Sequence, residues 1–249
     1  MDKIRFSLTE DGGQEFKPPL ACEELQRGSG EPVEWLPGPS LSYRIIKRLI
    51  DIIGSLILLV ACAPLFLAIM LAVKLTSRGP AVFRQTRVGY RGKRFTFLKF
   101  RSMYMNLDRK MHKEYVTHLI SGKYGPVGEQ GVYKLANDSR LTPVGRFLRR
   151  TSLDELPQFW NVLHGDMSLV GPRPPIPYEL ALYQPWQVQQ LLSVKPGITG
   201  IWQIEGRSKT AFEEMVKLNI EYVKHPSILL DLRILFTTPI AVIRADKAF

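Results

Sequence analysis

The longest uncharged apolar stretch in the chain runs from Ile52 to Val73. At a rise of about 1.5 Å per residue, a straight helix of this length could cross a lipid bilayer. Pro64 lies near the middle of the stretch, where a proline removes a helical hydrogen bond and favours a kink. The pattern therefore predicts a membrane helix that is broken at Pro64.

Basic side chains flank this stretch on both sides. They are Arg44, Lys47, Arg48, Lys74, Arg78, Arg84 and Arg87. Lysine and arginine gather on the cytoplasmic side of membrane segments, so we expect both ends of the stretch on that side. Residues 41–80 are therefore predicted to form a re-entrant membrane helix. A kinked helix that spans the bilayer is the alternative.

A second apolar segment runs from Ile228 to Ile243, but it contains Asp231, Arg233 and Pro239. These residues make it a poor spanning helix. Two interpretations remain open: the segment lies along the membrane interface, or it packs against the core of a globular domain.

Two segments after the long apolar stretch, Ala81–Thr86 and Arg94–Arg101, have the composition of strands. Gly89 and Gly92 lie between them and favour a hairpin loop. The sequence therefore predicts an α+β fold: a mainly helical, membrane-associated domain with a small β-hairpin and a re-entrant membrane helix.

Alternation along the second strand places Lys99 and Arg101 on the same face as Phe95 and Phe97. Two adjacent cations are suited to binding a diphosphate. Neighbouring basic residues on a strand are, however, more often simply solvated. Both interpretations stay open at this point.

Thr142-Pro143 predicts the start of a helix, with threonine as the cap and proline at the first helical position. The helix continues through Arg146, Arg149 and Arg150, so it gathers positive charge.

Asp154 and Glu155 follow this basic helix. Ser152 and Glu155 match a capping box, whereas Pro157 favours a helix that begins at the proline. In either register the two carboxylates lie at or just before a helix N-terminus, which favours their ionised form. This placement suits a carboxylate nucleophile, although acidic residues at helix starts are commonly caps and nothing more.

Arg173 lies in the proline-rich loop Gly171–Pro175. The prolines stiffen the loop, and a guanidinium held in this way matches phosphate oxygens in a bidentate manner. An ordinary proline-rich turn is the alternative.

The net charge of +11 suits nucleic acid, an anionic membrane surface or a phosphorylated substrate. Residues 1–40 hold 8 acidic and 4 basic side chains, so the remainder of the chain carries +15. We predict a flexible acidic extension over residues 1–40, the membrane helix region over 41–80, and a cytoplasmic catalytic domain with interfacial helices over 81–249. From the opening residues we expect no secretory signal. Cys22 and Cys62 form no recognisable metal or disulfide pattern.

With these segments in place, the chain resembles the bacterial sugar transferases that act as polyprenyl-phosphate hexose-1-phosphate transferases, also called monotopic phosphoglycosyl transferases. The resemblance extends from about Tyr43 to Ala245. It rests on Lys47-Arg48-Leu49-Ile50-Asp51, Lys99-Phe100-Arg101-Ser102-Met103, Asp154-Glu155-Leu156-Pro157-Gln158, the run from Asn161 to Pro174, and Lys195-Pro196-Gly197-Ile198-Thr199-Gly200.

The resemblance implies a membrane-inserted enzyme that uses Mg²⁺ and a nucleotide diphosphate sugar, which we expect to be UDP-linked. The acceptor would be polyprenyl phosphate, and the transfer would prime glycan or exopolysaccharide assembly. Asp154 would be the nucleophile that carries a covalent phosphosugar, and Glu155 the adjoining acid and metal ligand. The candidate phosphate ligands are Lys99, Arg101, Arg149, Arg173 and Arg207.

The implied location is the cytoplasmic face of the bacterial inner membrane, with membrane lipid as a partner. A non-catalytic membrane scaffold for glycan-assembly enzymes is the rival interpretation. We expect no nucleic acid partner, because the basic and aromatic residues match no recognisable nucleic-acid module. The sequence leaves the oligomeric state open, a homo-oligomer included.

Overall fold

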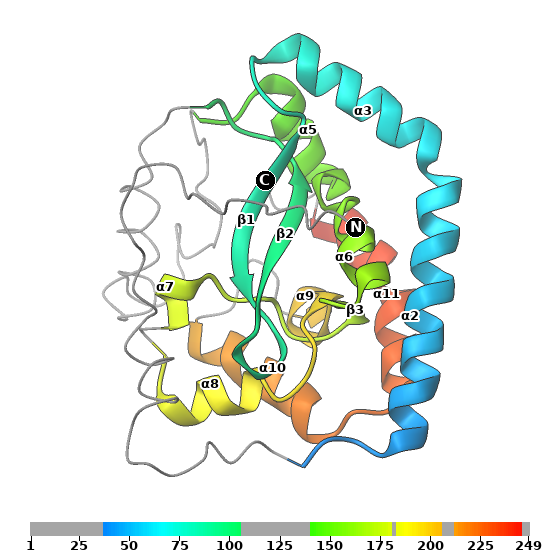
Figure 1. The fold of residues 1–249 in the computed structure, drawn as a ribbon, viewed down its shortest axis with the longest axis vertical. Helices are drawn as coiled ribbons and strands as arrows, with labels where there is room; N and C mark the ends of the chain where they lie inside the picture. Colours follow the sequence, from blue (N-terminus) through cyan, green and yellow to red (C-terminus); the bar gives the residue numbers. More distant parts are fainter. Residues whose placement is uncertain (1–36, 106–139, 181–182, 206–211, 246–249) are drawn as a thin grey trace, which may run out of the picture.

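The computed structural model describes residues 37–105, 140–180, 183–205 and 212–245 (Figure 1). The predicted acidic extension, apart from residues 37–40, and the candidate ligand Arg207 lie outside the described residues. The helices and strands in chain order are α2 (Leu41–Ala61), α3 (Ala63–Thr76), β1 (Val82–Val88), η1 (Tyr90–Gly92), β2 (Arg94–Phe100), α5 (Pro143–Thr151), η2 (Leu153–Glu155), α6 (Gln158–His164), β3 (Ser168–Val170), α7 (Pro177–Leu180), α8 (Pro185–Leu191), β4 (Gly197–Thr199), α9 (Ile201–Glu205), α10 (Phe212–Lys224) and α11 (Ile228–Ala245).

Helices α2 and α3 form a bent pair along one side of the molecule (Figure 1). The two axes meet at 62° with the break at Cys62, and Pro64 lies in the first turn of α3. A proline is tolerated there because the first turn of a helix needs no hydrogen bond from its N–H. The predicted break is therefore confirmed. In the part of the chain that the structure describes, no single helix is long and apolar enough to cross a membrane, whereas the bent pair together meets that test.

Two basic residues bond the first half of α2 to other elements of the molecule. Lys47 Nζ lies 2.9 Å from Asp231 Oδ2 on α11. Arg48 donates to the carbonyl oxygens of Val162 and Leu163 near the end of α6, at 2.7 and 2.8 Å. The Val162 carbonyl also accepts from the Gly165 N–H at 3.0 Å, so the guanidinium adds further bonds at the C-terminal end of α6.

Asp51 fixes α2 one turn further along. Its Oδ1 accepts hydrogen bonds from Ser168 Oγ and the Leu169 backbone N–H, both at 2.9 Å. The carboxyl group is buried, and these bonds offset part of the cost of removing it from water. The motif Lys47-Arg48-Leu49-Ile50-Asp51 thus fastens α2 to α11, α6 and β3.

Strands β1 and β2 form the predicted antiparallel hairpin, with Val82 opposite Phe100 and Val88 opposite Arg94. Asn161 on α6 holds the middle of β2: its side-chain Nδ2 donates to the Thr96 carbonyl at 2.7 Å. This bond fixes the hairpin relative to the segment that carries Asp154 and Glu155.

The predicted alignment of Lys99 with Arg101 is not maintained, because β2 ends at Phe100. Arg101 turns towards the end of α3, where its Nη2 donates to the carbonyl of Ser77 at 2.7 Å and to that of Val73 at 3.3 Å. The guanidinium therefore bonds the end of α3 to the end of the hairpin.

A second, parallel sheet joins β3 to β4, with Ser168 paired to Gly197 and Val170 to Thr199. The sequence did not predict it, because strands of three residues are too short to show alternation. The pair lies between α6, α11 and α2 and forms part of the core.

Helix α11 confirms the core-packing interpretation of Ile228–Ile243 for one of its faces, and the membrane-interface interpretation stays a prediction. Ile234 is fully buried in the core, whereas Phe236, Ile240 and Ile243 on the other side are exposed. One face packs on the domain and the other is an unpartnered apolar surface among the described residues.

Candidate active site

The segment from α5 to α6, which carries Asp154 and Glu155, lies between the hairpin and the bent helix pair (Figure 1). Thr142 Oγ1 accepts from the Gly145 N–H at 2.8 Å, which confirms the predicted helix start. Gly145 is packed directly against the Ser102 carbonyl, where a Cβ would clash. This close contact holds α5 against the end of β2.

Ser152 ends α5 in the left-handed conformation, with φ of 57°. Its side chain makes no capping bond to η2, so the predicted capping box at Ser152 is wrong. Helix α6 begins at Gln158 after Pro157, as the second predicted register required. Asp154 and Glu155 lie on the short 3-10 turn just before α6.

Lys99 on β2 lies within electrostatic range of both carboxylates. Burial lowers the pKa of Lys99 to about 8; the charge of Arg149 lowers it further, and the charges of Asp154 and Glu155 oppose this. Asp154 is only 7% exposed. The structure therefore brings together four residues that the sequence proposed from three separate motifs.

Arg87 is a neighbour of this group that sequence reasoning used only as a basic flank of the apolar stretch. It is buried, its Nη1 donates to the Pro174 carbonyl at 2.6 Å, and its guanidinium lies 5.0 Å from the Phe97 ring centre. Burial lowers the pKa of Arg87 to about 10, the charge of Arg173 lowers it further, and the charge of Glu179 raises it. Arg87 thus lies close to the loop that carries Arg173.

Glu179 was missed altogether. Its Oε2 lies 3.4 Å from Arg173 Nη1 and accepts from the Ile176 N–H at 2.9 Å. A glutamate six residues after an arginine across a proline-rich turn gives no pattern for an ion pair. The signal available in the sequence was the spacing of Glu179 after Ile176, which fits a carboxylate that caps the turn of α7.

Two of the candidate phosphate ligands are not placed with the carboxylates. Arg101 is bonded to the end of α3, so its predicted phosphate contact stays a prediction. Arg207 lies outside the described residues.

Asp154 and Glu155 are the acidic side chains available for a metal at this site. The described ranges contain no group of three histidine, cysteine, aspartate or glutamate side chains that could enclose a metal ion. Mg²⁺ is commonly held by one or two carboxylates together with the phosphates of a substrate. The pair therefore fits an ion that binds with a diphosphate, and does not fit a closed structural metal site.

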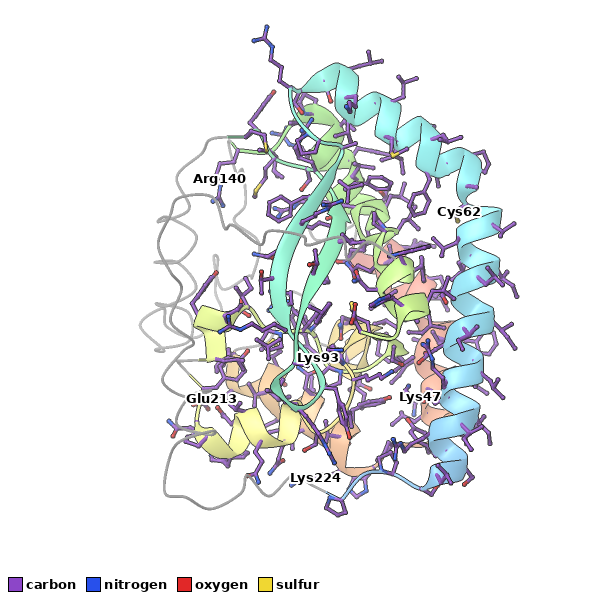
Figure 2. All side chains as sticks on the ribbon, viewed as in Figure 1. Lys47, Cys62, Lys93, Arg140, Glu213 and Lys224 are labelled. Atoms are coloured by element: carbon purple, nitrogen blue, oxygen red, sulfur yellow. The ribbon has the colours of Figure 1, made fainter. Side chains whose placement is uncertain are left out.

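Exposed apolar side chains continue from the bent pair onto the elements that carry the site, and Figure 2 shows many side chains of α2 and α3 pointing away from the body of the molecule. Phe147 on α5 and Trp160 on α6 are each 57% exposed, and Phe236 on α11 is 77% exposed. These elements contact one another, and large apolar side chains exposed on neighbouring elements suit a membrane or protein interaction site.

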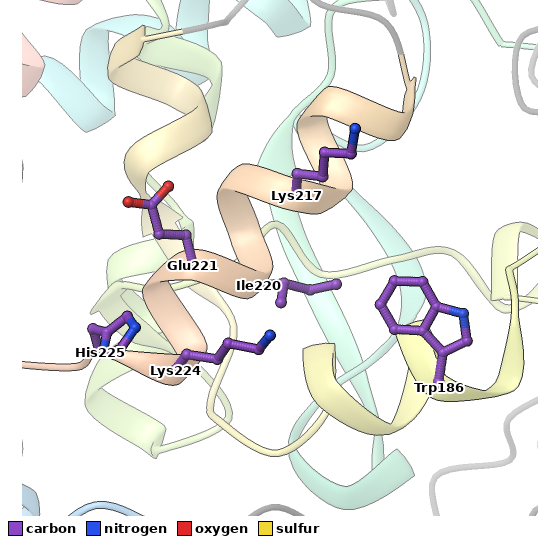
Figure 3. A pocket seen from close by; sticks show the side chains of 6 residues that line it. All are labelled: Trp186, Lys217, Ile220, Glu221, Lys224 and His225. Carbon is purple, nitrogen blue, oxygen red and sulfur yellow. The ribbon is translucent and has the colours of Figure 1, made fainter.

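A groove of about 340 Å³ lies between α8 and α10 (Figure 3). None of the candidate site residues lines it. Its lining residues are Trp186, Lys217, Ile220, Glu221, Lys224 and His225.

The model of the bacterial sugar transferase family matches residues 42–245, which include every described element of the site. This chain belongs to the bacterial sugar transferase family. The match begins at α2 and ends at the last residue of α11, so the bent pair and the apolar helix α11 both belong to the family unit.

Three relatives in this family differ in their identity to this chain and in how much of their length the match covers. The chain is 44% identical over 209 residues to the undecaprenyl-phosphate galactose phosphotransferase of Salmonella typhimurium, and the match covers 84% of this chain and 42% of that protein. It is 41% identical over 228 residues to the UDP-glucose:undecaprenyl-phosphate glucose-1-phosphate transferase of Escherichia coli, covering 86% and 44%. It is 39% identical over 201 residues to the exopolysaccharide production protein ExoY of Sinorhizobium fredii, covering 80% and 85%. The chain thus spans less than half the length of the first two relatives.

Proposed function

We propose that this bacterial sugar transferase moves a hexose-1-phosphate from a UDP-sugar to undecaprenyl or a related polyprenyl phosphate, and so primes glycan or exopolysaccharide assembly. The observation that carries the proposal is the grouping of Lys99 and Arg149 around Asp154 and Glu155, beside an exposed apolar surface. A diphosphate donor requires the cations, and a polyprenyl acceptor requires the apolar surface. The names of the relatives supply the substrate classes.

In the proposed reaction, an Asp154 carboxylate oxygen attacks the sugar-linked phosphorus of the donor. A P–O bond to Asp154 forms, the bridging P–O bond of the diphosphate breaks, and nucleoside monophosphate leaves with the electron pair. A phosphate oxygen of the polyprenyl phosphate then attacks the same phosphorus and releases Asp154. Burial of Asp154 supports this scheme, because limited access of water protects a phosphoaspartate from hydrolysis.

The basic residues would hold the transferred phosphate in line and neutralise its charge, which is most of the work of phosphoryl-transfer enzymes. Lys99 and Arg149 lie beside the carboxylates, and Arg173 lies on the loop whose Pro174 carbonyl accepts from Arg87. These positions support the proposed role. Glu155 would hold Mg²⁺ jointly with the donor diphosphate, and the ion would supply further charge neutralisation there.

We further propose that the bent pair enters the cytoplasmic leaflet of the bacterial inner membrane and returns to the same side. Lys47, Arg48 and Asp51 bond the first half of α2 to the globular part, and Arg101 bonds the end of α3 to it. A single span would separate these two ends by about 30 Å of hydrocarbon. Bonds from both ends to one compact domain therefore favour re-entry.

The test is release of UMP from UDP-glucose or UDP-galactose by the purified full chain, with undecaprenyl phosphate present. Repeated turnover that depends on both the lipid and Mg²⁺ is the expected result. Without the lipid the scheme allows at most one UMP per enzyme, because the phosphosugar then stays on Asp154. Membrane binding without any UMP release from either donor would favour the scaffold interpretation over an enzyme for these sugars.

A further inference from the structure

Glu179 is a buried carboxylate that the reaction scheme above does not use. It is 1% exposed, so it cannot contact a substrate. Removing a charged carboxylate from water is costly unless a cation and hydrogen bonds compensate for it. Arg173 provides the cation at 3.4 Å, and the Ile176 N–H provides a hydrogen bond at 2.9 Å.

Residues Gly171–Pro175 of the Arg173 loop are also held by bonds that do not involve Glu179. On one side the Gly171 N–H donates to the Thr199 carbonyl at 2.8 Å. On the other side the Val88 N–H donates to the Pro175 carbonyl at 3.0 Å. The bond from Arg87 to the Pro174 carbonyl adds a third attachment.

A fixed backbone does not determine the orientation of the Arg173 guanidinium, because the side chain has several rotatable bonds. Its side chain is 25% exposed, so part of the group reaches the surface while Nη1 faces Glu179. Arg87 lies close enough for its charge to oppose that of Arg173, and the Glu179 carboxylate lies near both cations.

We infer that Glu179 is a positioning residue, which holds the Arg173 guanidinium in the orientation that presents it to the transferred phosphate. This inference rests on the proposed function, in which Arg173 is a phosphate ligand. One Arg173 nitrogen is paired with the buried carboxylate, which restrains the planar fork while the side chain remains 25% exposed. The carboxylate also balances part of the charge of two neighbouring arginines when no substrate is bound.

The first variant is Glu179→Gln, which keeps an oxygen acceptor for the Ile176 N–H and loses the charge. We expect kcat/KM for the UDP-sugar to fall about tenfold, since a misdirected ligand loses roughly one charge-assisted hydrogen bond in the transition state. The matched control is Glu221→Gln in the groove of Figure 3, where the carboxylate is exposed and lies on α10; its kcat/KM should be unchanged.

A double-mutant cycle with Arg173→Gln separates positioning from general support of the fold. If Glu179 acts through Arg173, the double variant R173Q/E179Q has the same kcat/KM as R173Q alone. A further tenfold loss in the double variant would overturn the inference. The double variant removes both members of the ion pair, and its comparison with R173Q decides the question together with the loss measured for E179Q alone.

The cycle also distinguishes failure of the inference from failure of the proposed function. An R173Q variant with unchanged kcat/KM would remove Arg173 from the phosphate site and reject that part of the function, and the inference with it. An impaired R173Q together with a fully active E179Q would reject the positioning role alone.

Discussion

Raising the pH should switch off donor binding by discharging Lys99, with a midpoint near pH 8. Burial lowers the pKa of the Lys99 ammonium from 10.5 to about 8, with Arg149 adding to the effect. If the ammonium neutralises donor phosphate, kcat/KM for the UDP-sugar falls about tenfold for each pH unit above 8, because kcat/KM follows the ionisation of the free enzyme. At pH 9 about one tenth of the activity at neutral pH remains.

Stability should change in the opposite direction over the same range. The pKa of Lys99 is lower in the folded chain than the ordinary value of 10.5, so the unfolded chain binds more protons between pH 8 and 10.5. The contribution of Lys99 to the free energy of unfolding therefore rises with pH in this window. Activity that falls while the thermal midpoint holds or rises would exclude alkaline unfolding as the cause.

Arginine at position 99 stays charged throughout this range, so Lys99→Arg should abolish the decline near pH 8 even if its activity at neutral pH is lower. The control is Lys195→Arg. Burial also lowers the pKa of Lys195, but its charged neighbours are Arg48, Asp51 and Asp166 on the side of α2. This control should keep the decline of the native chain. An unaltered decline in Lys99→Arg would refute the assignment.

Three further predictions concern the carboxylates, the loop and the membrane helix. Asp154→Asn should lower the rate of UMP release by at least about 10⁴-fold and leave the thermal midpoint unchanged. Glu155→Gln should lower the rate on the order of 10²-fold, and raised Mg²⁺ should restore part of it. The same response of both variants to a Mg²⁺ titration would contradict separate roles. Arg173→Lys should lose about tenfold in kcat/KM with membrane binding intact, because a point charge replaces a planar fork. Single cysteines at Ser42 and Ser77 should react with an impermeant reagent from the same face of sealed vesicles, and labelling from opposite faces would show that the pair spans.

The sequence predicted the features that local chemistry determines. The hairpin follows from strand composition around two glycines, the start of α5 from Thr142-Pro143, and the break of the apolar helix from Pro64. Each depends on residues that are neighbours in the chain. The same local patterns also located Asp154 and Glu155 before a helix start.

The features that the sequence did not predict depend on contacts between distant segments. Strands β3 and β4 pair Ser168 with Gly197 over three residues, which is too short for any periodic signal. Arg101 follows the alternation of β2 in the sequence, but the strand ends one residue earlier and the side chain turns to the carbonyl oxygens at the end of α3. Glu179 looked like an ordinary acid near a helix start, and only the folded loop brings it to Arg173.

The basic residues before the apolar stretch of α2 have a structural role that the sequence analysis did not consider. Re-entry was predicted from the positive charge at both ends of the apolar stretch, on the assumption that each basic side chain is solvated in the cytoplasm. In the structure Lys47 is paired with Asp231 and Arg48 with the end of α6. These two charges therefore act less through the membrane potential or lipid headgroups than through bonds to the domain. Because the break at Cys62 and the bonds at both ends are fixed by different residues, loss of Pro64 should change the bend without releasing α2 from the domain.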